Sequence, residues 1–291
     1  MVGEKSWSSR LFSGINAILL SLIALVTVLP FVHVFGSSFA TSAEIAATNF
    51  LLIPTKFSLD AYAYIFSTST LPKAMLVSIL VTGLGTAWSM LISVMTAYGL
   101  SRRDLRGRNA IMFLFVFTML FNGGMIPTFL VVQGTGLINS YLALVVPVTI
   151  NVFNMIILKT FFQNLPAGLE ESAKIDGCSD FGVLFRIVIP CSMPAIATIS
   201  LFYAVTYWNT YMHAIMYLND ASKWPVQVLL RQIIVLASGL NYDNTVYTDV
   251  PPPSQSVKMA VIVVATLPVL VVYPFLQKHF AKGALLGSIK A

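Results

Sequence analysis

Charge is scarce in this chain of 291 residues, because only 10% are Asp, Glu, Lys or Arg, whereas soluble domains carry about 25%. Hydrophobic residues make up 57%. These two proportions exclude an ordinary soluble domain and indicate a membrane protein. Cysteine is scarce too: Cys178 and Cys191 provide neither a disulfide framework nor the spacing of a zinc site. We therefore expect no metal on this chain.

Long segments without Asp, Glu, Lys or Arg define the candidate membrane spans. A transmembrane helix needs about 20 mostly apolar residues, and a charge at its centre costs roughly 2.5 to 3.5 kcal/mol. One charge-free segment, 109–158, is long enough for two helices joined by a turn at Gly134-Thr135-Gly136. We predict an all-α membrane protein in which one domain, 1–291, crosses the bilayer six times. The predicted spans are 12–35, 74–100, 110–132, 138–158, 187–207 and 259–277.

The positive charges are distributed unequally between the two sides of these spans. Of the 17 Lys and Arg residues, 12 lie on the side that holds both termini and 5 on the other. Cytoplasmic loops carry the excess of Lys and Arg, so we predict that both termini are cytoplasmic. The run SRRDLRGR after the second span then sets topology, and the net charge of +6 requires no nucleic-acid partner.

Two long segments, 36–73 and 208–257, are predicted to lie outside the cytoplasm. Within the second, apolar residues recur at helical spacing from Val226 to Ala237, which predicts a helix that is too short to span. The residues that follow, 238–256, are polar and rich in turn formers and proline, as expected of an external loop.

Glycine and proline residues are expected to interrupt several spans. In lipid, a proline leaves a backbone carbonyl unpaired unless neighbouring groups or water satisfy it, so broken helices tend to line cavities. Kinks are also common in ordinary membrane bundles, and both interpretations stay open for each residue. The residues concerned are Pro30, Gly123, Gly124, Pro127, Pro147, Pro190, Pro194, Pro268 and Pro274.

A charged segment, EESAKIDGCSDFGVLFRIVIP, separates the fourth and fifth spans. Pro166 suits the first turn of a helix, acidic residues follow it, and Gly177 is a typical stop. These signals predict a short cytoplasmic helix over 167–177, about 15 Å long. Glu170 and Lys174 are four residues apart and are expected to pair.

The carboxylates of this helix do not suggest catalysis. Glu171 and Asp176 are five residues apart, which rotates them by about 140° around a helix, so they cannot easily share a proton or a metal. We predict no catalytic residue. A solvated amphipathic helix is one interpretation. A rigid helix that docks into a groove of a cytoplasmic partner, with the small Ala173 allowing close approach, is another. Asp180 or Ser179 is expected to cap the next helix.

The sequence Glu171-Ser172-Ala173, with Gly177 and then Ile187-Val188-Ile189-Pro190, resembles the EAA motif of permease subunits from ATP-binding-cassette (ABC) importers. Ser172 replaces the usual central alanine, and Ile189 replaces the usual leucine. Four further segments resemble the carbohydrate-uptake permeases related to the second membrane subunit of the maltose importer, especially the branch for complex oligosaccharides. They are LPAGLEESAKIDG, YWNTYMHAIMYLND, WPVQVLLRQI and YPFLQKHFAKGALLGSIKA.

This resemblance implies a permease subunit of the bacterial plasma membrane that moves a sugar, most simply an oligosaccharide, inward. It implies four partners besides the lipid bilayer: a second permease subunit, two ATP-binding subunits and an extracytoplasmic solute-binding protein. ATP and Mg²⁺ would bind the ATPase subunits, and this chain has no G-x-x-x-x-G-K-[ST] motif. The tail after Lys278 would approach the ATPase. The contacts that couple the two would be Glu170, Glu171, Ala173, Asp176 and Gly177.

Five residues are candidates for the sugar pathway, because sugar sites combine aromatic rings with amide and hydroxyl groups. They are Asn151, Asn154, Trp208, Asn209 and Tyr211. Hydrogen bonds between helices explain the asparagines equally well, and an aromatic belt explains Trp208 and Tyr211. The alternative to the importer as a whole is a self-sufficient secondary transporter or channel, which should carry ionisable residues within its spans.

Overall fold

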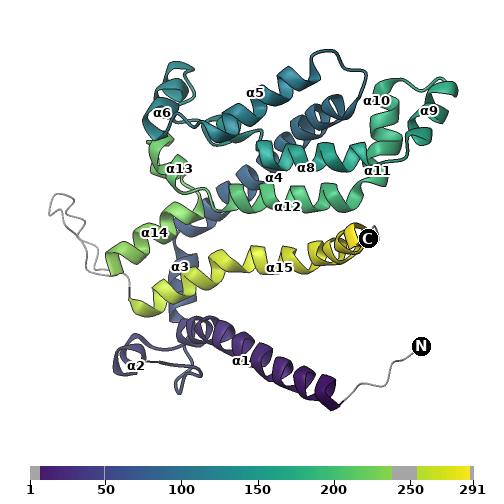
Figure 1. Ribbon diagram of the computed structural model, residues 1–291. Helices are drawn as coiled ribbons and strands as arrows, with labels where there is room; N and C mark the ends of the chain where they lie inside the picture. The colour runs from purple at the N-terminus through teal and green to yellow at the C-terminus, as the bar shows by residue number, and fades with distance from the viewer. Residues whose placement is uncertain (1–6, 49, 238–253, 289–291) are drawn as a thin grey trace. The chain divides into compact units, whose positions relative to one another are not determined.

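The computed structural model describes residues 7–48, 50–237 and 254–288, and their regular structure is helical (Figure 1). The first half contains α1 (Trp7–Ser38), α2 (Ser42–Ala47), α3 (Asp60–Ser67), α4 (Thr70–Ser101), α5 (Arg108–Leu120), α6 (Met125–Gly134), α7 (Leu142–Val145), the 3₁₀ turn η1 (Val146–Val148) and α8 (Val152–Gln163). The second half contains α9 (Ala167–Ile175), α10 (Asp180–Val183), the π-helical turn η2 (Leu184–Val188), α11 (Ile189–Cys191), α12 (Met193–Trp208), α13 (Met212–Tyr217), the 3₁₀ turn η3 (Ala221–Lys223), α14 (Val226–Ala237) and α15 (Gln255–Ser288).

Three helices of the described chain, α1, α4 and α15, are long and apolar enough to cross a membrane unbroken. Three bent pairs raise the number of spans to as many as six: α5 with α6 at 117°, α7–η1 with α8 at 54°, and α10–α11 with α12 at 86°. All six predicted spans therefore have a counterpart, but 110–132, 138–158 and 187–207 are interrupted helices.

The interruptions lie where the backbone cannot continue a helix. Between α5 and α6, Gly124 has a φ of +90°, a backbone conformation that residues other than glycine rarely adopt. Pro147 lies in η1, just before the second bend, and Pro194 lies in the first turn of α12, just after the third. A proline supplies no N–H group for the preceding turn, so it favours a helix start at these points. Pro30 and Pro268, in contrast, lie inside unbroken helices.

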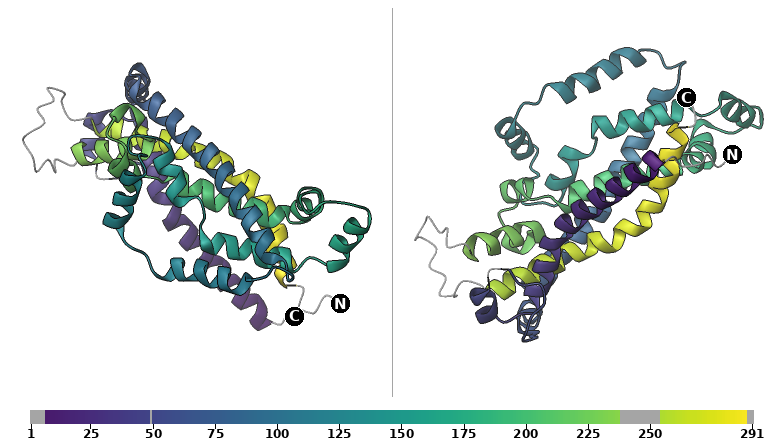
Figure 2. Two further views of the ribbon diagram at one scale, coloured as in Figure 1. Left: turned by 90° about the horizontal axis from the view of Figure 1, so that it is seen from above. Right: turned by 60° about the horizontal axis from the view of Figure 1, so that its bottom comes forward.

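Residues 70–229 and 267–291 form one compact unit, in which α4 packs along both α8 and α12 (Figure 2). Small residues on α4 permit this close packing. A Cβ atom added to Gly85 would lie only 2.9 Å from the ring of Tyr207. The hydroxyls of Ser89 and Ser93 on α4 lie 2.7 Å from those of Tyr207 and Tyr203 on α12, respectively. The core of this unit is therefore apolar but contains buried hydrogen bonds.

The other unit contains residues 1–69 and 230–266. In this unit α1 is apolar, and this chain buries no residue of its most hydrophobic stretch of 18 residues. The end of α1 is anchored by the loop that follows α2. The Nδ1 atom of His33 accepts a hydrogen bond from the Leu51 amide at 3.1 Å, and the His33 ring stacks on Phe50 with centroids 4.7 Å apart.

Candidate functional site

The charged segment forms α9, which is shorter than the predicted helix 167–177. Pro166 precedes its first turn, and Gly177 ends it with a φ of +80°. The Cys178 amide donates to the Ala173 carbonyl at 2.9 Å, and the Gly177 amide donates to the Lys174 carbonyl at 3.0 Å. This pair of bonds is the Schellman motif, which uses a left-handed residue to close a helix. Gly177 therefore fixes the point at which the chain leaves α9.

The ion pairs around α9 differ from the expected Glu170–Lys174 pair, and that prediction is wrong. Glu170 instead accepts a bond of 2.6 Å from Arg102, which directly follows α4. Lys174 lies 3.1 Å from Asp180 at the start of α10. Arg102 also lies 3.5 Å from Asp104. A backbone hydrogen bond, and next the charge of Arg102, hold the pKa of that exposed carboxyl below its usual value. Glu170 and Lys174 of α9 thus each have a charged partner outside the helix.

The side chains of α9 divide between an inner and an outer face. Ala173 is only 7% exposed and packs into this chain's own core, so its small size serves a contact within the chain. Glu171 and Asp176 are exposed. Ile175 is 86% exposed, which is unusual for a large apolar side chain next to charged residues. The exposed part of α9 and its C-cap therefore combines the carboxylates of Glu171 and Asp176 with the apolar side chains of Ile175 and Leu169, which is 42% exposed.

The segment after α9 leads directly into the fifth span. Ser179 caps α10, because its hydroxyl accepts a hydrogen bond from the Gly182 amide at 3.2 Å. From there α10, η2 and α11 continue to the bend before α12 (Figure 1). Between Ser179 and α12 the chain is helical except at Ser192, so few irregular residues separate α9 from α12.

The five candidate pathway residues lie at the start of α8 and at the end of α12, where several of them have structural roles. Asn151 caps α8, because its Oδ1 atom accepts from the Asn154 amide at 3.1 Å, and Asn154 itself is 5% exposed. Trp208 is 6% exposed at the end of α12, which does not place it in an exposed aromatic belt. Asn209 donates to the carbonyl four residues earlier at 2.8 Å, and Tyr211 is half-buried. Their role in a sugar pathway stays a prediction.

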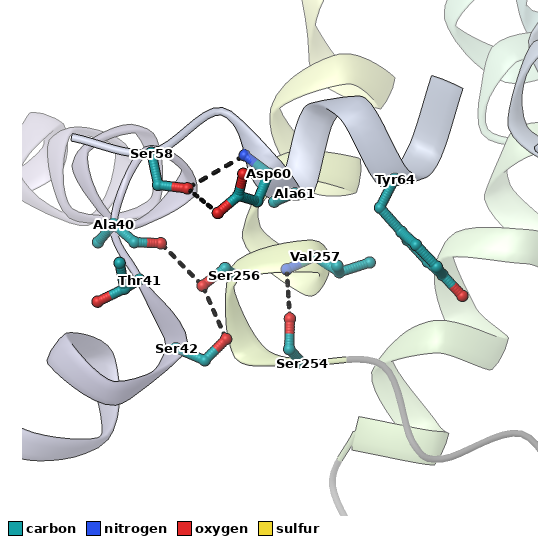
Figure 3. A pocket seen from close by; sticks show the side chains of 10 residues that line it. All are labelled: Ala40, Thr41, Ser42, Ser58, Asp60, Ala61, Tyr64, Ser254, Ser256 and Val257. Atoms are coloured by element: carbon teal, nitrogen blue, oxygen red, sulfur yellow. Dashed lines mark hydrogen bonds between the residues drawn. The ribbon is translucent and has the colours of Figure 1, made fainter. Parts of the chain in front are cut away.

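A separate pocket of about 490 Å³ lies in the unit that contains α1 (Figure 3). Its polar lining consists mostly of hydroxyl groups and includes the carboxylate of Asp60, which accepts from Ser58 at 2.8 Å. The lining residues are Ala40, Thr41, Ser42, Ser58, Asp60, Ala61, Tyr64, Ser254, Ser256 and Val257. Among the described residues that line it there is a carboxylate and no cationic side chain, so this part of the pocket suits hydroxyl or cationic groups better than acids.

Two predicted regions lie outside what the structure describes. Most of the external loop 238–256 belongs to residues 238–253, and the side chains of the tail after Lys278 are likewise not described. Within the described residues, no group of three His, Cys, Asp or Glu side chains could hold a metal ion.

Comparison with known proteins identifies the family. Residues 89–285 match the family described as "binding-protein-dependent transport system inner membrane component". The chain is 65% identical, over 97% of its length and 99% of the relative's, to the polygalacturonan/rhamnogalacturonan transport system permease protein YtcP of Bacillus subtilis strain 168. Protein LplC of the same strain is 51% identical over 97% of this chain and 96% of its own.

A solved structure supports the same assignment. The chain aligns with a TM-score of 0.87 and 33% identity to a chain in the crystal structure of a bacterial ABC transporter involved in the import of the acidic polysaccharide alginate. The alignment covers 96% of this chain and all of that one. Family, relatives and fold agree that this is a membrane subunit and not an enzyme. The chain belongs to the family of inner-membrane permease components of binding-protein-dependent ABC transport systems.

Proposed function

We propose that this permease imports acidic oligosaccharides, with uronic acid units in the chain. The observation that carries this proposal is the 65% identity, over nearly the whole length, to a permease named for polygalacturonan and rhamnogalacturonan. The structural relative at 33% identity serves alginate, which is also an acidic polysaccharide. Two relatives with different polymers thus share one chemical feature, the carboxylate-bearing sugar.

We further propose that the chain works with a second permease subunit, two ATP-binding subunits and an extracytoplasmic binding protein. ATP and Mg²⁺ bind the ATP-binding subunits in this arrangement. Both termini and α9 face the cytoplasm, as the excess of Lys and Arg on that side supports. A cysteine placed at Arg106, in the loop after α4, should then be labelled by a membrane-impermeant reagent only from the cytoplasm. Labelling from outside would reverse the topology.

In this arrangement, α9 is the helix that docks on an ATP-binding subunit. Its outer face presents Glu171, Ile175 and Asp176, which are exposed and suited to a groove with an apolar floor and a basic rim. Ala173 is omitted from the contact, because this chain already buries it. Gly177 contributes through its left-handed conformation, which shapes the exit from the helix.

The test of the substrate class is an ATPase assay of the whole complex. The tagged chain is co-purified with its partners, reconstituted in proteoliposomes and supplied with the binding protein and oligogalacturonate, with neutral malto-oligosaccharides as the control. We expect stimulation of hydrolysis and uptake by oligogalacturonate alone. Stimulation only by neutral sugars would overturn the acidic substrate, and transport by a homogeneous chain without ATPase would revive the self-sufficient transporter.

The test of docking uses substitutions on the outer face of α9. Asp176→Lys reverses a charge at the end of the helix, and Gly177→Pro removes the amide that donates to Lys174. Both should abolish uptake and release the ATP-binding subunits while the two permeases stay inserted and paired. Ser172→Ala, which alters an exposed hydroxyl on the same helix, is the matched control and should keep transport. Full transport by Asp176→Lys would contradict the docking role.

A further inference from the structure

Arg102 occupies an unusual position at the junction between α4 and the loop that follows it. Its side chain is only 18% exposed, whereas the neighbouring Arg103 and Arg106 are exposed. One guanidinium nitrogen donates to the Tyr98 hydroxyl at 3.0 Å and to Glu170 at 2.6 Å. A topology determinant needs only a charge on the correct side of the membrane, so these specific bonds require another explanation.

The charged contacts of Arg102 reach the start of α9 and the start of α10, the helix that follows it. Glu170 lies in the first turn of α9, and Asp180, 3.7 Å from the second terminal nitrogen of Arg102, begins α10 just after α9. Lys174 joins Asp180 from the last turn of α9 at 3.1 Å. The charges thus form a small network in which one guanidinium links the end of α4 to the start of α9 and to the turn beyond it.

A second contact connects the same elements. The Gln163 side chain, at the end of α8, donates to the Ser101 carbonyl at the end of α4 at 3.3 Å. Because α4 packs along α8 and α12, the end of α4 is a firm base within its unit. Without Arg102, α9 would be joined to this base chiefly through the short connections 164–166 and 176–179 and through its buried face.

We propose that Arg102 is a positioning residue that makes α9 and α4 move as one body during transport. This inference rests on the proposed docking of α9 on an ATP-binding subunit. In the proposed movement, displacement of α9 reaches the membrane by two routes, along the chain through α10 to α12 and across the Arg102–Glu170 pair to α4.

The chemistry of the side chain explains why arginine occupies this position. A guanidinium is planar, always charged and offers five N–H donors, so it can bind two carboxylates and a hydroxyl at once. A lysine ammonium at the same place is a point charge on a flexible stem. Since Arg102 and Glu170 are 18% and 25% exposed, solvent and salt screen this pair less than a surface pair.

The experiment measures the distance between α4 and α9 in the assembled transporter. Spin labels are placed at Gly83 and Gly168, where an added Cβ meets nothing within 4 Å, after replacement of Cys178 and Cys191 by serine. Gly83 lies 18 residues before the end of α4, which is about 27 Å along the helix axis from the point where Arg102 joins α4 to α9, a length within reach of pulsed electron paramagnetic resonance. The complex is compared without nucleotide and after trapping with Mg·ATP and vanadate, which requires no knowledge of the sugar.

In the otherwise unchanged protein, the distance distribution should have the same centre and width in both states. Arg102→Gln should shift or broaden this distance distribution in the trapped state. The number of substrate molecules carried per ATP hydrolysed should fall about fivefold, the factor that corresponds to an ion pair worth about 1 kcal/mol. Glu170→Gln, which keeps every positive charge of the loop, should have the same two effects. It replaces Arg102→Gln as the test variant if the latter inserts poorly into the membrane. Arg106→Gln is the matched control for charge, and it should change neither value.

The outcomes separate the two proposals. If the ATP-binding subunits do not co-purify with the unchanged protein, the docking role of α9 fails, and the role of Arg102 fails with it. If they co-purify but Arg102→Gln and Glu170→Gln behave like Arg106→Gln, only the positioning role is overturned. An Arg102→Gln/Glu170→Gln double variant no worse than either single variant would support action through this pair.

Discussion

Removing a single hydroxyl group by Tyr203→Phe tests what stabilises the break in the fourth span. Tyr203 is 2% exposed, and its hydroxyl lies 2.7 Å from the Ser93 hydroxyl. It also accepts a hydrogen bond of 2.9 Å from the Asn151 amide. Asn151 directly precedes α8, so its N–H group has no carbonyl of a preceding helical turn to bond. The Tyr203 hydroxyl thus satisfies a backbone group at the bend.

The magnitude follows from what each partner can do afterwards. Ser93 can turn its hydroxyl toward the carbonyl four residues earlier in α4, so its loss is small. The Asn151 amide has no such choice. A donor left unsatisfied in a fully buried site costs roughly 1 to 3 kcal/mol, this bond is part-buried, and interhelical bonds in membranes average about 0.6 kcal/mol. We expect a loss of about 1 to 2 kcal/mol, or a fall in Tm of roughly 2 to 8 °C for a protein of this size.

The assay is thermal unfolding of the purified complex, followed by the loss of monodisperse protein on heating. Tyr207→Phe is the matched control. Tyr207 lies one turn away on α12, and its hydroxyl contacts Ser89 at 2.7 Å and the Val145 carbonyl at a longer 3.4 Å. Its removal should cost less, because no backbone N–H group loses its partner. Equal Tm values for the unchanged protein and Tyr203→Phe, or an equal fall for both variants, would refute the reasoning.

Two other predictions concern different parts of the chain. Gly85→Ala should destabilise the packing of α4 on α12 by about 1 to 3 kcal/mol, because the new methyl would lie 2.9 Å from the Tyr207 ring, while Gly83→Ala, with open space around its Cβ, should leave the Tm of the complex unchanged. Glu44 accepts bonds of 2.6 and 2.7 Å from the Thr55 amide and hydroxyl, which lower the pKa of its carboxyl below the usual 4.5. The stabilisation from the ionised Glu44 carboxylate and its hydrogen bonds to Thr55 is therefore present at neutral pH, and it is lost as the pH falls below 4.5 and through the lowered pKa. The protection of the Thr55 amide against hydrogen exchange, measured relative to its intrinsic rate at each pH, should therefore fall in that range. In Glu44→Gln this pH-dependent loss of protection should be absent.

The fold was predictable from the sequence because a bilayer imposes simple rules. Long segments without charge predicted the three long apolar helices and the three bent helix pairs of the described chain, and glycine and proline marked the bends near Gly124, Pro147 and Pro194. The size of each bend was not predictable, since it depends on the packing of neighbours. The bend that contains Gly124 measures 117°, whereas the one next to Pro147 measures 54°, and neither residue type sets an angle by itself.

The position of the candidate site in the sequence was predictable, whereas its contacts with residues far away in the sequence were not. Proline, acidic residues and Gly177 located α9, because caps and stops act locally. Spacing alone favoured a Glu170–Lys174 pair, yet Arg102, 68 residues earlier, binds Glu170 instead. The inward orientation of Ala173 likewise depends on how α9 packs on the rest of its unit. Arginine next to a span is expected for topology alone, so no signal in the sequence distinguished Arg102 from Arg103.

The break between α5 and α6 has a consequence for how the protein is made. Leu120 to Gly124 lie exposed on this chain, and there the Asn122 side chain accepts a bond of 2.8 Å from the Gly124 amide. Lipid cannot replace the backbone bonds that a continuous helix would have, at a cost of several kcal/mol for each unsatisfied group. If the proposed second permease subunit covers this segment, a chain made ahead of that partner would expose these backbone groups to lipid, and balanced production of the two subunits would favour its accumulation.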